Sequence, residues 1–161
     1  MIRAADAIAA LRERLAGASP SAALDAELLV ARVLGIGRAA LAADPGRALA
    51  PEELFALESF ARRRLAGEPV AYLAGRREFW SLDLEVTPDV LVPRPETELL
   101  VERALAAIAD RTRPAVLDLG TGSGAIALAI ASMRPDAAVT ATDRSAPALA
   151  VAKRNATRLG L

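Results

Sequence analysis

Val116-Leu117-Asp118-Leu119-Gly120-Thr121-Gly122-Ser123-Gly124 is the stretch that decides the fold which this sequence predicts. A short apolar run leads into alternating glycines, and an apolar helical segment follows them. A strand, a glycine turn and a helix in this order present backbone N–H groups and a helix N-terminus to a nucleotide-like ligand. The stretch therefore predicts an α/β sheet with a ligand site at the glycine turn.

The spacing of the glycines favours one class of cofactor. Dinucleotide sites carry the pattern G-x-G-x-x-G, whereas this turn reads G-x-G-x-G with hydroxyl side chains between the glycines. A cofactor with an amino-acid end needs acceptors as well as donors, and Asp118 precedes the turn, where its carboxylate can counter an ammonium group. We therefore expect S-adenosylmethionine, with a dinucleotide as the alternative. The expected cofactor-binding residues of the turn are Gly120, Thr121, Gly122, Ser123 and Gly124.

Asp143 is the second candidate for this site. It follows Gly124 by 19 residues, directly after a predicted strand at Ala138–Thr142. An acid about 20 residues past the glycine turn accepts ribose hydroxyls in nucleotide-binding α/β folds. A helix cap is the alternative role, but Ser145 is better placed to cap the helix that follows. We expect Asp143 to bind the ribose.

Residues 1–75 predict a small helical bundle, because their apolar residues recur at a spacing of three to four. Ser19 and Pro20 are expected to start one of these helices, with the Ser19 hydroxyl as the N-cap. The basic run Arg62–Arg64 is expected to be a solvated helix face, although it could also contact an acidic partner. The expected helices cover residues 4–16, 19–34, 38–43 and 51–65.

From Arg77 the apolar period changes from 3.6 to 2, which is typical of a strand. The alternation over Trp80–Val86 predicts a half-buried strand, and Val90–Val92 predicts a short return strand. We expect the two to form a β-hairpin linker over residues 76–94. Phe79 and Trp80 could line a substrate groove or belong to the core of this hairpin, and their positions do not separate the two.

Residues 95–161 carry the α/β pattern. A helix is expected through Ala109, followed by a strand at Ala115–Leu119 that is buried on both faces. The remaining expected elements are a helix at 124–133, a strand at 138–142 and a helix at 146–159.

Composition excludes several classes of function. The chain has no Cys and no His, which removes disulfide frameworks, Ser-His-Asp hydrolases and thiolate or imidazole metal sites, so we expect no metal. Acidic and basic residues number 20 each, so no basic face points to nucleic acid. No apolar run approaches the roughly 20 residues of a membrane span, and the N-terminus lacks a signal-peptide core. We expect a cytoplasmic protein without a membrane partner.

Three further stretches carry a family resemblance. They are Gly67-Glu68-Pro69-Val70-Ala71-Tyr72-Leu73-Ala74-Gly75, then Glu78-Phe79-Trp80, and Leu91-Val92-Pro93-Arg94-Pro95-Glu96-Thr97-Glu98. Together they closely resemble the release-factor protein-(glutamine-N5) methyltransferases, the HemK/PrmC family. The segment 117–131, with Asp143 and Asn155, is similar to the cofactor half of the same family. The resemblance covers essentially the whole chain.

The resemblance implies a function for each part of the chain. The reaction would transfer a methyl group from S-adenosylmethionine to the side-chain amide of the glutamine in the Gly-Gly-Gln motif of peptide-chain release factors. Residues 1–75 would recognise the release factor, residues 76–94 would link, and residues 95–161 would form the first part of a Rossmann-like methyltransferase domain, with Arg94–Thr97 near its cleft. The full-length protein is expected to be a monomer with no direct nucleic-acid partner.

One departure from the family matters more than the match. The family's catalytic signature, Asn-Pro-Pro-Tyr, clamps the planar amide, and it is absent here, since the only Asn, Asn155, precedes Ala156. Two parallel strands with two or three helices cannot cover both faces of a doubly wound sheet. We expect a truncated domain with exposed apolar surface, no catalytic residue and no turnover. The alternatives are a non-catalytic release-factor-binding module, an adenine amino-methyltransferase and a nicotinamide dehydrogenase.

Overall fold

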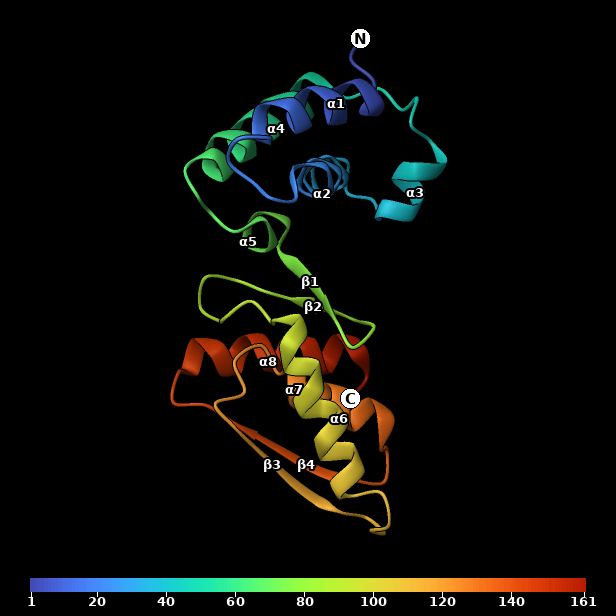
Figure 1. Ribbon diagram of the computed structural model, residues 1–161, viewed down its shortest axis with the longest axis vertical. Helices are drawn as coiled ribbons and strands as arrows, with labels where there is room; N and C mark the ends of the chain where they lie inside the picture. The colour runs from blue at the N-terminus through green and yellow to red at the C-terminus, as the bar shows by residue number, and fades with distance from the viewer. The chain divides into compact units, whose positions relative to one another are not determined.

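The computed structural model describes all residues, Met1–Leu161, and divides into two compact units. The unit Met1–Ala74 is helical, and the unit Gly75–Leu161 combines helices with two small sheets (Figure 1). The chain therefore has the predicted fold class, a helical N-terminal region followed by a small α/β unit. No helix is both long enough and apolar enough to cross a membrane.

The first unit is built around α2, which contacts α1, α3, α4 and α5. Figure 1 shows α2 end-on, with α1 and α4 packed across it. The apolar stripes that the sequence predicts meet in one core, in which Leu15 and Leu29 are fully buried. The five helices are α1 (Ala4–Leu15), α2 (Ala22–Leu34), α3 (Arg38–Ala43), α4 (Pro51–Leu65) and α5 (Val70–Ala74).

The expected N-cap at Ser19 is wrong. Helix α2 begins at Ala22, and Ser21 precedes it without making a side-chain cap bond. Both serine hydroxyls donate instead to the carboxylate of Asp25, from Ser19 Oγ at 2.7 Å and from Ser21 Oγ at 3.1 Å. Asp25 is fully buried. Burying an unpaired carboxylate costs much more free energy than leaving a helix without a side-chain cap. The two hydroxyls therefore bond to Asp25 rather than to the N-terminus of α2.

The basic run on α4 is not uniformly solvated, contrary to the prediction. Arg63 pairs with Glu68 at the surface, but Arg64 is only 13% exposed and its Nε donates to Asp25 at 2.7 Å. This buried ion pair joins the end of α4 to the start of α2. The one-dimensional pattern missed it because Arg64 and Asp25 are 39 residues apart.

The second unit contains two separate two-stranded sheets. Strands β1 and β2 are antiparallel, whereas β3 and β4 are parallel and are connected through α7, which contacts both of them. The register of the parallel pair runs from Ala115 opposite Ala138 to Leu119 opposite Thr142. The elements are β1 (Arg76–Phe79), β2 (Leu82–Glu85), the 3₁₀ helix η1 (Pro95–Thr97), α6 (Glu98–Ala107), β3 (Ala115–Leu119), α7 (Ala125–Met133), β4 (Ala138–Thr142) and α8 (Ala146–Leu159).

The hairpin differs from the prediction in its register. Its turn lies at Trp80 and Ser81, which both adopt positive φ angles of 52° and 59°, so the strands lie on either side of this pair. The expected return strand at Val90–Val92 does not form. A local turn at Thr87 redirects the chain instead, since the N–H of Val90 donates to the Thr87 carbonyl at 3.1 Å. Two central residues with positive φ angles form a type I′ turn, whose backbone twist matches that of the flanking strands. This match outweighs the cost of placing Trp and Ser, which do not favour positive φ angles, in the turn.

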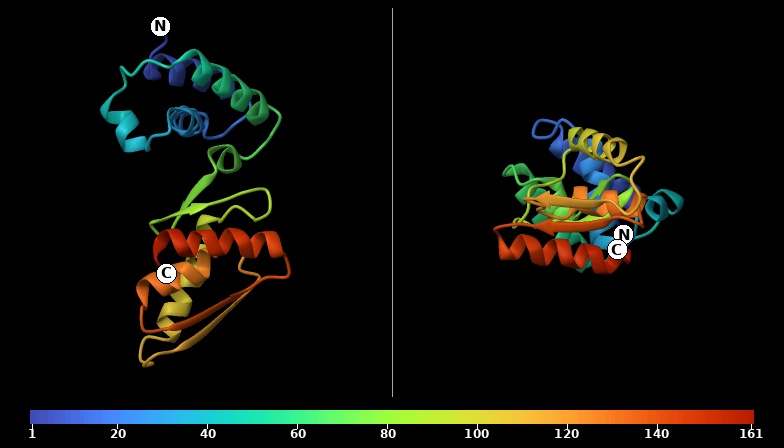
Figure 2. Two further views of the ribbon diagram at one scale, coloured as in Figure 1. Left: turned by 180° about the vertical axis from the view of Figure 1, so that it is seen from behind. Right: turned by 90° about the horizontal axis from the view of Figure 1, so that it is seen from below.

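The expectation that β3 is buried on both faces is also wrong. Val116 and Val139 pack into the core with α6 and α7, whereas Leu117 and Leu119 are 59% and 75% exposed. The right-hand view of Figure 2 looks onto this open face, which no other helix or strand of the chain covers. The unit therefore exposes apolar surface, as the sequence predicts.

Candidate cofactor site

The glycine loop, Gly120–Gly124, connects β3 to α7. Its three glycines all have positive φ angles, of 77°, 55° and 84°, which only glycine adopts readily. A Cβ atom on Gly124 would lie 3.0 Å from Leu128 Cδ1, so this end of the loop packs directly onto the helix. A Cβ on Gly120 or Gly122 would meet nothing within 4 Å, so the backbone there is open to a ligand.

The loop folds over the carboxyl end of β4. The N–H groups of Gly120 and Thr121 both donate to the carbonyl oxygen of Thr142, at 2.8 and 2.9 Å. The site thus lies at the carboxyl ends of two adjacent parallel strands, where open α/β sheets bind their ligands.

Asp143 and the glycine loop are in direct contact. Asp143 Oδ2 accepts a hydrogen bond from the N–H of Gly122 at 2.9 Å, and its Oδ1 accepts one from the N–H of Ser145 at 2.9 Å. The backbone N–H groups of Ser145 and Gly122 hold the pKa of the Asp143 carboxyl below its usual value. Asp143 is therefore ionised at neutral pH, and a carboxylate can accept more hydrogen bonds than the backbone supplies here.

Ser145 caps the next helix, as the sequence predicts. Its Oγ accepts from the N–H of Ala148 at 3.2 Å, in the first turn of α8. Asp143 is therefore not needed as the side-chain cap of α8.

The hydroxyl residues of the loop are turned inward. Thr121 Oγ1 donates to Asp118 Oδ2 at 2.7 Å, and Thr121 is only 7% exposed. Ser123 is 2% exposed. Direct contact with a ligand is thus available chiefly to the loop backbone and to the carboxylates of Asp118 and Asp143.

These groups fit an adenosyl amino acid. Two carboxylates at neighbouring strand ends can accept from ribose hydroxyls and from an ammonium group, and the open backbone at Gly120 and Gly122 permits close approach. A metal centre has no such support, since no group of three or more Asp or Glu side chains is arranged to hold an ion.

Of the two roles that the sequence left open for the neighbouring aromatic residues, the structure supports packing in the core. Phe79 is 2% exposed and belongs to the core of the second unit, so it does not line a groove. Trp80 is half-buried against the same core, and its backbone N–H donates to Glu98 Oε1 at 3.0 Å. Glu98 thus holds the hairpin turn against the first turn of α6.

Asn155 is a residue to which the sequence pattern assigned no role. Its Nδ2 donates to the carbonyl oxygen of Ser123 at 2.9 Å, although the two residues are 32 positions apart. A signal for it does exist, because Asn155 is a polar residue on the stripe of α8 that also carries Ala148, Val151 and Ala152.

The first unit contains a separate groove of about 450 Å³ between α1 and α4. Its floor is apolar, and the ion pair of Arg14 with Glu58, at 2.7 Å, bounds it. The lining residues are Ile2, Asp6, Ala7, Ala10, Leu11, Arg14, Leu54, Leu57 and Glu58. Its lining contains no glycine loop and no strand end, so the glycine loop is the better candidate for a cofactor site.

Comparison with known proteins finds a matching family model for each of the two units. Residues 6–75 match the family described as PrmC N-terminal domain, and residues 95–161 match the one described as Methyltransferase small domain. The release factor glutamine methyltransferase of Burkholderia pseudomallei is 57% identical over 145 residues, which are 88% of this chain and 50% of that protein. The chain belongs to the PrmC family of release factor glutamine methyltransferases.

Other members of the family give the same result. The release factor glutamine methyltransferase of Escherichia coli is 49% identical over 144 residues, 89% of this chain and 52% of that protein. The one from Coxiella burnetii is 47% identical over 156 residues, 97% of this chain and 56% of that protein. The chain thus spans about half the length of the curated family members it matches.

Proposed function

We propose that the glycine loop and Asp143 bind S-adenosylmethionine, and that the chain is part of a protein-glutamine methyltransferase acting on peptide-chain release factors. The observation that carries this proposal is the 2.9 Å hydrogen bond from the Gly122 N–H to Asp143 Oδ2. It joins segments 21 residues apart into one site with an open backbone and an ionised acid. The names of the relatives supply the substrate class.

Each group in the site has a proposed task. Asp143 accepts from the ribose hydroxyls, Asp118 faces the ammonium group, and the backbone of Gly120–Gly124 approaches the cofactor closely. S-adenosylmethionine supplies an electrophilic methyl group when bound. The amide nitrogen of the substrate glutamine would bond to this methyl group as the methyl–sulfur bond breaks, which would leave S-adenosylhomocysteine, and the nitrogen would lose a proton to solvent. The protein's task is therefore orientation rather than nucleophilic catalysis.

The remaining parts of the chain have proposed tasks as well. Residues 1–75 recognise the release factor, and residues 95–161 form the first part of the methyltransferase domain. Residues 76–94 connect these two domains. A release factor is the expected macromolecular partner, and the formal net charge of zero gives no support to direct contact with nucleic acid. We expect the full-length protein to be monomeric.

We propose that the 161-residue chain by itself does not catalyse methylation of a release factor. A side-chain amide that clamps the substrate glutamine must be accessible, and the only Asn of the chain, Asn155, is fully buried and bonded to Ser123 and Glu85. Methylation of a release factor by the purified chain would refute this part of the proposal.

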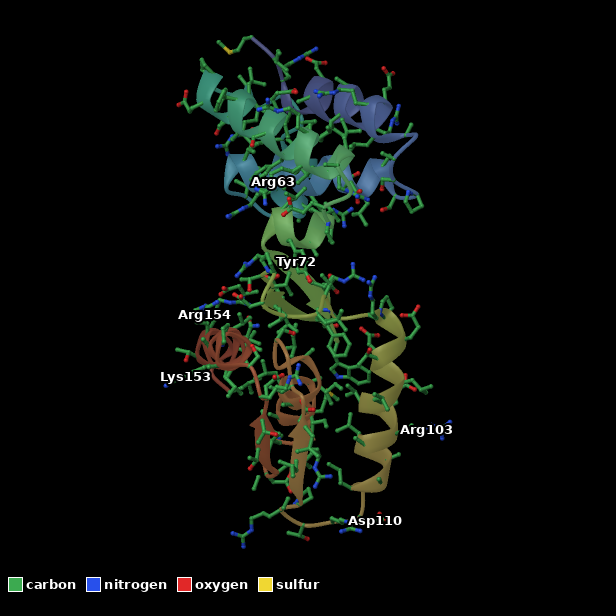
Figure 3. The ribbon with its side chains drawn as sticks, turned by 90° about the vertical axis from the view of Figure 1, so that its left-hand side faces the viewer. Arg63, Tyr72, Arg103, Asp110, Lys153 and Arg154 are labelled. Atoms are coloured by element: carbon green, nitrogen blue, oxygen red, sulfur yellow. The ribbon has the colours of Figure 1, made fainter.

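Calorimetric titration with S-adenosylmethionine tests the proposed function. We expect the wild-type chain to bind and Asp143→Asn to bind at least tenfold more weakly, because the variant loses the charge that receives the ribose hydroxyls. Asp110→Asn is the matched control, since Asp110 is an exposed acid beyond the end of α6 (Figure 3).

Equal affinity of Asp143→Asn and wild type would contradict the proposed site. Binding of NADH in place of S-adenosylmethionine would indicate a dinucleotide enzyme. Binding of a release factor without any cofactor binding would favour the non-catalytic module.

A further inference from the structure

Asn155 lies on the buried face of α8, and its side chain has no exposed surface. Val151 and Ala152 share this face and are also buried. Burying a side-chain amide costs free energy unless its donors and acceptors are bonded. The hydrogen-bond partners of Asn155 therefore indicate what this position does.

Asn155 first bonds the backbone of the hairpin. The N–H of Glu85 donates to Asn155 Oδ1 at 2.7 Å, and Asn155 Nδ2 donates to the Glu85 carbonyl at 3.0 Å. Because the N–H of Val86 donates to Gly75 across the hairpin, the backbone groups of Glu85 point away from β1. The amide of Asn155 thus takes the place of a neighbouring strand along the outer edge of β2.

Asn155 also bonds the glycine loop. Its Nδ2 donates to the carbonyl oxygen of Ser123 at 2.9 Å, and this carbonyl belongs to the peptide bond that enters Gly124. Gly124 has a φ angle of 84°, and Ala152 lies 3.3 Å from where its Cβ would be. Two side chains in adjacent turns of α8 therefore contact the second half of the loop.

We propose that Asn155 is a positioning residue that fixes the Ser123–Gly124 peptide, and with it the Gly122–Gly124 half of the loop, against β2. Through this loop it sets the affinity for the cofactor, a part of the inference that rests on the proposed function. The effect on the ligand-free loop does not depend on that function. Asn155 acts through the loop and does not touch the cofactor.

The hairpin has other anchors on α8. Arg154 Nη2 lies 2.7 Å from Glu85 Oε1, and Arg158 donates to the carbonyl oxygen of Asp83. Figure 3 shows Arg154 on the hairpin side of α8, whereas Lys153 points away. Exposed ion pairs of this kind contribute little to stability. Loss of Arg154 removes a hairpin contact alone, so Arg154→Ala is the matched control for loss of Asn155.

Amide hydrogen exchange of the ligand-free chain, measured by NMR, tests the loop directly. The Gly122 N–H donates to Asp143 and the Gly124 N–H donates to the Thr121 carbonyl, so both report whether the loop is closed. In Asn155→Ala and Asn155→Ser we expect both amides to exchange at least tenfold faster, while the amides between β3 and β4 keep their wild-type rates. Arg154→Ala should leave both loop amides unchanged.

Unchanged loop exchange in both Asn155 variants would overturn the proposal, and so would an equal acceleration throughout the β3–β4 sheet. If neither variant folds, the proposal is tested on the side-chain amide of Asn155 in the wild-type chain. Its Asn155 side-chain N–H should exchange slowly and show scalar coupling through the hydrogen bond to the Ser123 carbonyl carbon. A rapidly exchanging, uncoupled side-chain amide would contradict the proposal.

Titration of the same proteins with S-adenosylmethionine separates the two proposals. We expect Asn155→Ser to bind about tenfold more weakly at a temperature at which it is folded, and Arg154→Ala to bind like wild type. Faster loop exchange with unchanged affinity would refute the effect on the cofactor. No binding by the wild type, together with the expected loop exchange, would refute the proposed function while leaving the structural role of Asn155 intact.

Discussion

Gly124 meets two requirements of the loop that a larger residue does not. Its backbone is left-handed, and its missing side chain leaves room for Leu128 and Ala152. Gly122 is also left-handed, with a φ angle of 55°, but has open space around it. The glycines of the loop therefore serve different purposes, since Gly124 packs the loop onto the helices and Gly122 exposes backbone.

Replacing these glycines by alanine should destabilise the unit to different degrees. Gly122→Ala carries the cost of a left-handed alanine, about 1 kcal/mol. Gly124→Ala adds the close contacts with Leu128 and Ala152, and we expect a total of about 2 kcal/mol or more. Urea unfolding followed by Trp80 fluorescence measures both.

Gly17→Ala is the control for this series, because Gly17 has neither a positive φ angle nor a close neighbour. Equal stability of the Gly124→Ala and Gly17→Ala proteins would show that the packing of the loop on α7 and α8 is looser than the structure indicates.

At the residue scale, the sequence predicted what depends on local spacing. The Ser145 cap and the place of Asp143 directly after a strand follow from patterns within about 20 residues. The bonds of Asn155 were out of reach, because Glu85 lies 70 residues away from it. The turn at Trp80 and Ser81 was missed because neither residue type favours a positive φ angle.

At the element scale, the parallel strands and the longer helices were well predicted, whereas the short helix α5 was not expected. Strands Ala115–Leu119 and Ala138–Thr142 and helix Ala146–Leu159 have the expected bounds. Their periodicity is strong and their ends carry Gly, Pro or Ser, so local signals suffice. The burial of β3 was not predicted, because burial depends on which elements cover a sheet rather than on the strand's own residues.

The buried ion pair between α2 and α4 gives a prediction at the same scale. Arg64→Ala leaves the fully buried carboxylate of Asp25 with hydroxyl donors alone, and we expect a loss of about 3–5 kcal/mol. Arg63→Ala removes an exposed pair with Glu68 and should cost about 1 kcal/mol or less.

Thermal and urea unfolding followed by far-UV circular dichroism measures this difference between the two arginine variants. Similar stabilities would mean that water or another donor satisfies Asp25 once Arg64 is gone.

At the scale of the whole molecule, each unit has its own core, and the charge is balanced. The formal net charge is zero, with 20 acidic and 20 basic residues, so any partner must be recognised by shape and local contacts rather than by a general field. The open face of the β3–β4 sheet, with Leu117 and Leu119, is the main departure from a closed α/β domain. The chain corresponds to about half of each relative.

An NMR titration of the wild-type chain with S-adenosylmethionine is the most direct measurement of whether the glycine loop is a cofactor site. We predict saturable shifts in the amide signals of Gly120–Gly124 and Asp143–Ser145, with the groove between α1 and α4 unaffected. No shifts at saturating cofactor, or shifts confined to residues outside the loop and Asp143, would contradict the proposed site.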